Sequence, residues 1–461
     1  MDTFDLIVIG SGPSGEKAAM QGAKLNKRVL VIERGAEPGG ACMHTGTIPS
    51  KTLRESVRFL SMVRTQSVYG ISVRQDEHLT VNSLMFRKRG AIGALVERLE
   101  SNFERNDVVY RQGAAKFVEP HVVEVSSRDG SPEQYRGEFI VIATGSRPYR
   151  PDFVDFTDPH VLDADTVLNV QQIPKSVTIV GAGVIGCEYA TIFAHLGVRV
   201  NLVNPRQVLL DFLDQEISNA LDYLMRERGV RIRLNEVLEA VNTDEAEVSA
   251  YLESGKVLKS EFLLYANGRT GNTEGLGLEA LGIPVNSRKQ IDVNPFFQVA
   301  RYPHIYAVGD VIGFPSLAAT SMDQGRLAAK HAFTGADERL DTNLMPTGIY
   351  TIPEISFVGA TEEQLTRSKI PYEVGTSSYK EIARGQIMGN TTGRLKLLFH
   401  RETLKLLGVH ILGDEATDLV HLGQAVMSFG GTIEYFFDRV LNYPTFSECY
   451  RVAALNGYNR L

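Results

Sequence analysis

The chain has 461 residues, of which 43% are hydrophobic and 22% are charged, so we expect a globular protein that folds as several domains. A formal net charge of −7 and the absence of a long apolar run give no reason to expect a nucleic-acid partner or a membrane. With three cysteines and no visible secretory signal, the chain is expected to be cytoplasmic and to lack a disulfide framework.

The first elements follow a dinucleotide-binding pattern. An apolar strand over Phe4–Ile9 precedes a glycine-rich turn, and a helix over Glu16–Leu25 leads into a second strand over Arg28–Ile32. The turn carries three glycines, Gly10, Gly12 and Gly15. Glycine allows a tight turn and the close approach of a pyrophosphate, to which the helix N-terminus offers free N–H groups. Glu33, which ends the second strand, is placed to accept hydrogen bonds from a ribose.

A cysteine and a threonine lie five positions apart in the next segment, Gly39–Lys51. They are Cys42 and Thr47. Because threonine cannot form a disulfide, this pair cannot carry electrons as a dithiol. Further along, Val141–Gly145 is predicted to be a short buried strand that ends in a glycine turn.

The glycine pattern then occurs a second time. A strand over Ser176–Val180 precedes the turn, a helix over Cys187–Leu196 follows it, and a second strand covers Val198–Val203. The three glycines of this turn are Gly181, Gly183 and Gly186. Two complete patterns in one chain predict two dinucleotide-binding domains.

The repeat places a neutral residue at the position of Glu33. From Gly10 to Glu33 is 23 positions, and from Gly181 to Asn204 is also 23. A carboxylate there would bind a free 2′-hydroxyl and repel a 2′-phosphate, whereas Asn204 removes the repulsion and Arg206 could pair with the phosphate. Arg206 could instead be a solvated loop residue. Its position after the strand favours the first interpretation, a site that accepts both NAD(H) and NADP(H).

Over nearly its whole length the chain resembles the pyridine nucleotide-disulfide oxidoreductase family. Besides the two glycine turns, the resemblance is carried by Gly39–Lys51, Val141–Gly145, Leu264–Asn272, Ile305–Asp310, Pro346–Ser356 and Asn442–Gly457. It implies an α/β fold with two Rossmann-like dinucleotide-binding domains, for FAD and NAD(P), and a C-terminal α+β dimerisation domain. The expected domains are 1–150 (FAD, first part), 151–270 (NAD(P)), 271–339 (FAD and central, second part) and 340–461 (interface). Self-association, as a dimer or a larger homo-oligomer, is implied as well.

The resemblance also assigns site residues. The FAD site is expected to include Gly10, Gly12, Gly15, Glu33, Cys42, Thr47, Lys51, Thr144, Gly145 and Asp310. The NAD(P) site is expected to include Gly181, Gly183, Gly186, Glu188, Asn204, Arg206 and Gly268. Lys51 and Glu188 match family positions that form an ion pair beside the flavin, so they are the expected catalytic residues, although from sequence alone both could be solvated. A positive charge there would stabilise the reduced, anionic flavin.

Two departures from the family's disulfide reductases concern thiol chemistry. Those enzymes carry a second cysteine at the position of Thr47. They also carry a histidine base, paired with a glutamate, at the position that is Tyr443 here, while the glutamate remains as Glu448. A tyrosine with a pKa near ~10 is a poor base at neutral pH. Both parts of the thiol relay are therefore missing.

Within the family the likeness is greatest to the soluble, Si-specific transhydrogenases. The expected reaction is reversible hydride transfer, NADPH + NAD⁺ ⇌ NADP⁺ + NADH, by ping-pong through bound FAD. An NAD(P)H:quinone or dye reductase is the alternative. A thiol reductase that uses Cys187 or Cys449, and a flavin-bearing sensor without turnover, are further alternatives.

The remaining candidates give weaker signals. Cys42 could be an inert packing residue, which is the favoured interpretation, an oxidisable thiol or a remnant of a lost disulfide. His44 is the one histidine next to the flavin segment. No cysteine or histidine spacing is typical of a metal site, so no metal is expected.

Overall fold

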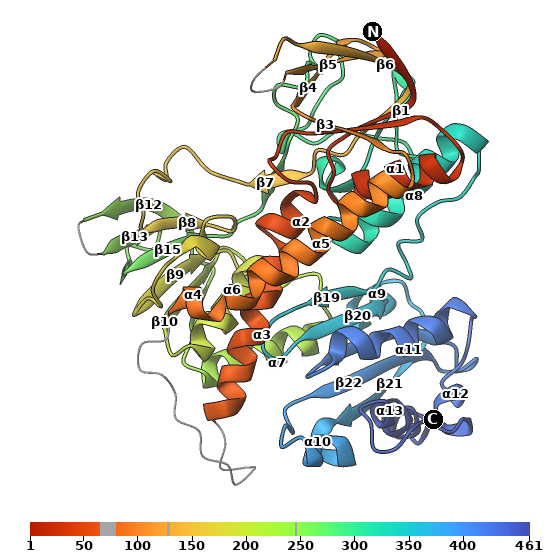
Figure 1. Ribbon diagram of the computed structural model, residues 1–461. Helices are drawn as coiled ribbons and strands as arrows, with labels where there is room; N and C mark the ends of the chain where they lie inside the picture. The colour runs from red at the N-terminus through yellow and green to blue at the C-terminus, as the bar shows by residue number, and fades with distance from the viewer. Residues whose placement is uncertain (65–79, 127–129, 245–246) are drawn as a thin grey trace.

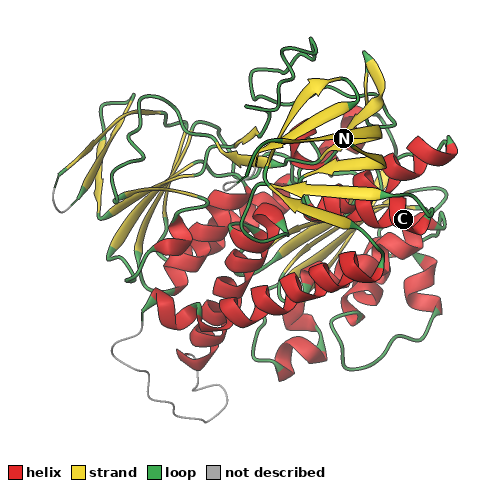
Figure 2. Cartoon of the chain, turned by 45° about the horizontal axis from the view of Figure 1, so that its top comes forward, coloured by secondary structure: helices red, strands yellow, loops and turns green. Residues whose placement is uncertain are grey.

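The computed structural model describes residues 1–64, 80–126, 130–244 and 247–461. Its strands form two largely parallel sheets and a five-stranded antiparallel sheet, each accompanied by helices, together with a three-stranded antiparallel sheet and a two-stranded ribbon (Figures 1 and 2). The expected fold class, an α/β protein with two dinucleotide-binding domains and a C-terminal α+β domain, is confirmed. The domain boundaries expected from the sequence remain predictions.

The first sheet combines strands from residues 2–142 with strands from residues 298–307. Its strands in spatial order are β17 (Gln298–Val299), β18 (Tyr302–Ala307), β6 (Glu133–Ile142), β1 (Asp2–Ile9), β2 (Val29–Glu33) and β3 (Val109–Gln112). An antiparallel branch adds β4 (Ala114–Glu119) and β5 (Val122–Ser126). Because β18 pairs in parallel with β6, the chain returns to this sheet after leaving it.

Two long helices pack against each other beside this sheet. Helix α1 (Pro13–Lys24) follows the first glycine turn, and α8 (Ala318–Thr334) lies next to it (Figure 1). A Cβ at Gly325 would lie 1.9 Å from the Ser14 carbonyl oxygen, so only glycine permits this crossing. Among the described residues, the other helices of this part of the chain are α2 (Gly40–His44), α3 (Thr47–Arg64), α4 (Val81–Leu84) and α5 (Phe86–Arg105).

The second parallel sheet lies in the middle of the chain. Its strands in spatial order are β11 (Arg231–Leu234), β10 (Arg199–Asn204), β9 (Ser176–Val180), β15 (Phe262–Tyr265) and β8 (Val161–Asp163). A separate antiparallel sheet comprises β12 (Leu238–Thr243), β13 (Val248–Leu252) and β14 (Val257–Ser260). The helical elements of this region are η2 (Val167–Asn169), α6 (Val184–His195) and α7 (Gln215–Glu227).

The two crossings between the parallel sheets lie side by side. They are β7 (Ser146–Pro148) and β16 (Arg269–Gly271), which pair as a two-stranded antiparallel ribbon. The ribbon ties the exit from the first domain to the return from the second. The 3-10 helix η3 (Gly309–Ile312) follows β18 directly.

The C-terminal sheet is antiparallel. Its strands in spatial order are β19 (Thr347–Ile349), β20 (Ile355–Gly359), β23 (Leu406–Leu412), β22 (Arg394–His400) and β21 (Tyr372–Ser378). Its helices are α9 (Glu362–Arg367), η4 (Tyr379–Glu381), α10 (Ala383–Ile387), α11 (Ala416–Ser428), α12 (Glu434–Asp438) and α13 (Glu448–Tyr458). Helix α3 of the first domain runs down toward this sheet (Figure 1).

The internal repeat is also a structural repeat. Gly10 and Gly181 adopt φ values of +104° and +105°, which L side chains rarely adopt. A Cβ at Gly15 would lie 1.9 Å from the Gly10 carbonyl oxygen, and one at Gly186 would lie 1.8 Å from the Gly181 oxygen. The third glycine is thus required by contact with the first glycine's carbonyl. Each helix begins before its expected start, at Pro13 and Val184 rather than Glu16 and Cys187.

Candidate functional site

The first glycine turn leaves backbone donors free at the start of α1. The helix is capped by Gly12, which has no side chain to accept from the first-turn N–H groups. Glu33 is buried nearby, and its Oε2 accepts hydrogen bonds from the backbone N–H and hydroxyl of Ser11, at 2.9 and 2.7 Å. Its Oε1 accepts from Gly35 N–H at 2.8 Å. The free helix N-terminus suits a pyrophosphate, and the fixed carboxylate suits a ribose.

The second half of this site comes from the crossings between the sheets. Asp310, in η3, accepts a hydrogen bond from the Ser146 hydroxyl at 2.7 Å. Arg269 donates to that hydroxyl at 2.8 Å and to the Ser146 carbonyl at 2.9 Å. The Thr144 hydroxyl is buried and has no hydrogen-bond partner in the structure, and Gly145 beside it has a φ of +67°. An orphaned donor next to a glycine in a left-handed turn fits a polar ligand, as expected for FAD.

The second glycine turn repeats this geometry with a different residue. Helix α6 is capped by Gly183, again without a side-chain acceptor. Asn204 Oδ1 accepts from Ala182 N–H at 3.4 Å, the counterpart of the Ser11–Glu33 bond. Asn204 Nδ2 donates to the carbonyls of Val208, at 2.9 Å, and Arg206, at 3.3 Å. A carboxylate could not make these two bonds, so Asn204 organises the loop after β10 in a way that an acid cannot.

Arg206 projects from that loop toward solvent. Its side chain is 64% exposed and forms an ion pair with Asp211, which is 44% exposed. Gly268, at the opposite crossing, has a φ of +102°, and its carbonyl accepts from Tyr149 N–H at 3.1 Å. The loop therefore offers one charged group that could meet a phosphate, and that group already has a partner within the chain.

Lys51 and Glu188 meet across the two domains. Lys51, on α3, places its Nζ 2.6 Å from Oε2 of Glu188, on α6. Glu188 is only 4% exposed, and its Oε1 accepts from the backbone N–H of Tyr350 at 2.9 Å. The Lys51 ammonium also lies 4.9 Å from the centre of the Tyr350 ring. The alternative in which Glu188 is solvated is wrong.

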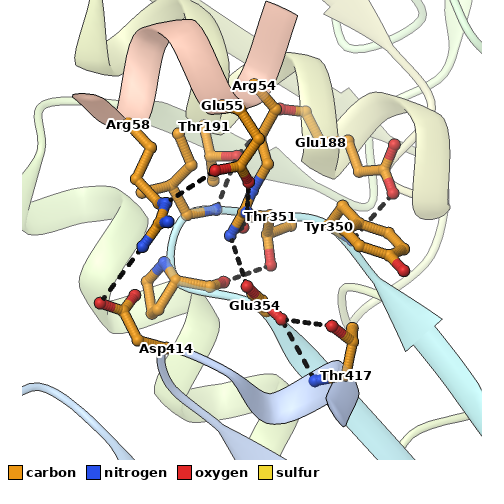
Figure 3. A network of polar contacts seen from close by, with 12 residues as sticks. Arg54, Glu55, Arg58, Glu188, Thr191, Tyr350, Thr351, Glu354, Asp414 and Thr417 are labelled. Carbon is orange, nitrogen blue, oxygen red and sulfur yellow. Dashed lines mark hydrogen bonds and ion pairs between the residues drawn. The ribbon is translucent and has the colours of Figure 1, made fainter. Parts of the chain in front are cut away.

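A network of polar side chains fixes the segment that carries Tyr350 (Figure 3). Arg54 is 2% exposed and donates to the Thr351 carbonyl, at 3.3 and 3.2 Å, and to Glu354 at 3.1 Å. On α6, the Thr191 hydroxyl accepts from Ile352 N–H at 3.2 Å. These supporting residues were not predicted from the sequence. The spacing of Lys51 and Arg54, three positions apart on one helix, was the available signal.

Cys42 and Thr47 face each other, but no cysteine has a thiol partner. Burial raises the pKa of the Cys42 thiol, although the Thr47 side chain lies within hydrogen-bonding reach and opposes the shift. All three cysteines are free, and burial raises the pKa of Cys449 to about 12. Tyr443 is 72% exposed, and the Oε2 of Glu448 is buried without a hydrogen-bond partner. The described residues thus contain neither a dithiol nor its base.

The structure also defines the surroundings of His44 and of one acidic cluster. The ring of His44 contacts the Pro38 carbonyl through Nε2, at 2.9 Å, and its possible role stays a prediction. Carboxylates of Asp214, Glu216 and Glu362 lie close enough together to hold a metal ion. Lys396 occupies this position instead, with its ammonium 2.8 Å from Asp214 and 3.1 Å from Glu216.

Comparison with known families decides the classification. The family model described as "pyridine nucleotide-disulphide oxidoreductase" matches residues 4–325, and the model of the dimerisation domain of the same family matches residues 345–454. The chain belongs to the pyridine nucleotide-disulphide oxidoreductase family. The match to the dimerisation domain indicates that it self-associates.

Relatives within the pyridine nucleotide-disulphide oxidoreductases match over the full length. Soluble pyridine nucleotide transhydrogenases from Mycobacterium tuberculosis (strain ATCC 25177 / H37Ra) and Marinomonas sp. (strain MWYL1) are each 48% identical. The alignments cover 100% and 99% of this chain and 98% and 99% of those proteins.

Solved structures of other proteins share the fold of this chain. A copper(II) complex of the HOCl-induced flavoprotein disulfide reductase RclA from Escherichia coli has 28% identity and a TM-score of 0.88, and the match covers 99% of each chain. LpdA from Mycobacterium tuberculosis has 23% identity and a TM-score of 0.91, also over 99% of each chain, and shows the fold alone. Among the described residues, no helix combines the length and the apolar character that crossing a membrane requires.

Proposed function

We infer that this family member is an FAD-dependent transhydrogenase that catalyses NADPH + NAD⁺ ⇌ NADP⁺ + NADH. The observation that carries this inference is the pairing of Cys42 with Thr47 on an otherwise complete family scaffold. Full-length relatives at 48% identity, named soluble pyridine nucleotide transhydrogenases, support it. With no dithiol among the described residues, electrons that arrive from one nucleotide can leave only to another small acceptor.

Bound FAD supplies the group that takes up a hydride from one nicotinamide and gives it to another. We propose that its pyrophosphate lies at Gly10, Gly12 and Gly15 and its ribose at Glu33. Asp310 holds the ribityl chain, while Thr144, Gly145, Cys42 and Thr47 line the ring. No proton needs to move between protein and solvent in the overall exchange. This agrees with the loss of the histidine base at Tyr443.

Lys51 and Glu188 are the proposed catalytic pair. By family resemblance they lie beside the flavin on the nicotinamide side. The Lys51 ammonium favours negative charge that develops on the reacting ring, and Glu188 keeps the ammonium in place. The Tyr350 backbone N–H and the Arg54 network support Glu188 from the C-terminal domain, so the pair is held in a fixed position before nucleotide binds.

One nucleotide site is proposed to serve both substrates in turn. Gly181, Gly183 and Gly186 receive the pyrophosphate, and Gly268 lies at the crossing beside it. Asn204 removes the charge repulsion that would exclude NADP(H), and Arg206 pairs with the 2′-phosphate. A shared site requires ping-pong kinetics, because the first product must leave before the second nucleotide enters.

The location and the partners of the enzyme are proposed from general properties of the chain. We propose a cytoplasmic homo-oligomer, a dimer or larger, that works on free nucleotides and binds neither nucleic acid nor membrane. The unpaired cysteines and the net charge of −7 support this setting.

The direct test is anaerobic turnover of the purified, FAD-loaded enzyme with NADPH and thio-NAD⁺ as the sole acceptor. We expect thio-NADH to form, with parallel lines in double-reciprocal plots at several fixed concentrations of one nucleotide. Bleaching of the flavin without thio-NADH would contradict transhydrogenation and indicate a quinone or dye reductase. An absence of bleaching would indicate a protein without turnover.

A further inference from the structure

The ion pair between Arg206 and Asp211 stands at the proposed 2′-phosphate position. Both side chains are solvent-accessible, at 64% and 44% exposure, and Arg206 Nη1 donates directly to Asp211 Oδ2. A carboxylate that holds the proposed phosphate partner is unexpected in a site that must bind NADP(H). It supplies the same kind of ligand, an anionic oxygen, that the 2′-phosphate would supply.

The turn that carries Asp211 is anchored to the glycine loop. Leu209 and Leu210 are buried, at 1% and 2% exposure, and Leu210 N–H donates to the Ala182 carbonyl at 3.1 Å. Leu210 adopts a φ of +44°, a conformation that a branched side chain rarely takes, and Ser218 donates to the Leu209 carbonyl at 2.6 Å. Asp211 is therefore held at a defined place relative to the phosphate-binding turn.

The Arg206 side of the loop is anchored as well. The Asn204 side chain donates to the carbonyls of Arg206 and Val208, and its Oδ1 accepts a hydrogen bond from Ala182 N–H. The carbonyl of the same Ala182 accepts a hydrogen bond from Leu210 N–H. Both ends of the 204–211 loop thus converge on Ala182, between Gly181 and Gly183. The pairing of Arg206 with Asp211 is a consequence of this backbone arrangement.

We propose that Asp211 is a specificity-determining residue, which competes with the 2′-phosphate for Arg206 and so brings the affinities for NADP(H) and NAD(H) closer together. This inference rests on the proposed single nucleotide site. When NAD(H) binds, the Arg206–Asp211 pair stays intact. When NADP(H) binds, Arg206 exchanges the carboxylate for the phosphate, and Asp211 remains nearby as a like charge. Affinity for NADP(H) is lowered, while affinity for NAD(H) is unchanged.

Similar affinities for NADP(H) and NAD(H) favour a ping-pong exchange through one site. If the phosphate were bound much more tightly than a free hydroxyl, NADP⁺ would occupy the site and exclude NAD⁺. A built-in counter-ion weakens the phosphate contact without removing it. Arg206 still discriminates for the phosphate, since guanidinium–phosphate pairs are bidentate and Asp211 is bound through one oxygen.

The test compares the affinities of two probes that lack nicotinamide, 2′,5′-ADP and ADP, by calorimetry on the FAD-loaded enzyme. In Asp211→Asn and Asp211→Ala we expect 2′,5′-ADP to bind about two- to five-fold more tightly, since exposed ion pairs are of this strength, and ADP to bind unchanged. The matched control is Asp222→Asn, which removes a half-buried partner of Arg226 on α7 and should change neither affinity.

A double-mutant cycle tests separately whether Arg206 binds the 2′-phosphate and whether Asp211 competes with that phosphate. In Arg206→Gln we expect 2′,5′-ADP to bind about ten-fold more weakly, and adding Asp211→Asn should then strengthen binding by less than it does when Arg206 is present, because only the like-charge repulsion is relieved. If Arg206→Gln leaves 2′,5′-ADP unchanged, the proposed 2′-phosphate site itself is wrong. If Arg206→Gln weakens binding but neither Asp211 variant strengthens it, Arg206 keeps its role and the competition by Asp211 is overturned.

Discussion

Glu188 joins all three parts of the molecule through its two carboxylate oxygens. Oε2 lies 2.6 Å from Lys51 Nζ of the first domain, and Oε1 accepts from Tyr350 N–H of the C-terminal domain at 2.9 Å. Glu188 itself lies on α6, which follows the second glycine turn. Because the carboxylate is buried, each of these contacts compensates part of its desolvation. The position of Lys51 therefore depends on how the three domains pack.

Replacement of Lys51 by Met should slow flavin reduction by NADPH. The variant leaves the site without its positive charge, and loss of one electrostatic contact of this kind lowers rates by about 10²-fold or more. Stopped-flow absorbance would measure the rate, and the FAD content should stay at one per chain. Lys259→Met removes an exposed lysine paired with Glu247 and serves as the control. Equal rates in the two variants would contradict a catalytic role for Lys51.

Replacement of Arg54 by Met should destabilise the folded protein. Arg54 is 2% exposed, and its loss removes the donor to the Thr351 carbonyl and to Oε1 of buried Glu354, while Thr417 still donates to Oε2. Breaking a buried pair typically costs about 3–5 kcal/mol. Urea unfolding would measure this loss. Arg58→Met is the comparison, because Arg58 is 26% exposed, and should cost about 1 kcal/mol or less. A similar loss of unfolding free energy in both variants would show that the buried contacts of Arg54 stabilise the fold no more than the more exposed contacts of Arg58.

Thr47→Cys should restore a disulfide without restoring a disulfide reductase. The Thr47 side chain already lies beside the Cys42 thiol, so a cysteine there has a partner at hand. Alkylation and mass spectrometry should find two fewer free thiols in the oxidised variant than in the reduced one. Thiol-substrate turnover should stay at background, since Tyr443 replaces the base. Efficient turnover would show that the missing histidine is not what prevents this chemistry.

Acid should destabilise the enzyme through His410. Its pKa lies below the ordinary value because burial disfavours the charged ring, and its Nδ1 has no hydrogen-bond partner. The unfolded chain therefore takes up a proton near pH 6.5 that the folded chain resists, so stability falls as pH drops below about 6.5. In His410→Gln, urea unfolding at pH 7.5 and pH 5.5 should give a smaller difference in stability than in wild type. An equal difference would assign the acid sensitivity to other groups.

Local patterns in the sequence were enough to predict both dinucleotide-binding units. The spacing of Gly10 to Glu33 and of Gly181 to Asn204 fixes a turn, a helix and a strand, because each of these is decided by residues close together in the chain. Both helix starts were placed three residues late, since a glycine cap without a side chain gives no clear boundary. The absence of a second thiol at Thr47 was likewise a property of the sequence alone.

Contacts between distant residues came only from the tertiary structure. The support of Glu188 by Tyr350 joins residues 162 positions apart, and the Arg54–Glu354 pair joins residues 300 apart. No local periodicity encodes such pairs, because they depend on how distant parts of the chain pack together. Arg206 and Asp211 are close in sequence, but their pairing could not be predicted from the sequence either, since it depends on a left-handed turn at Leu210. The sequence thus determined the chemistry that is possible, and the packing of the domains decided which charges meet.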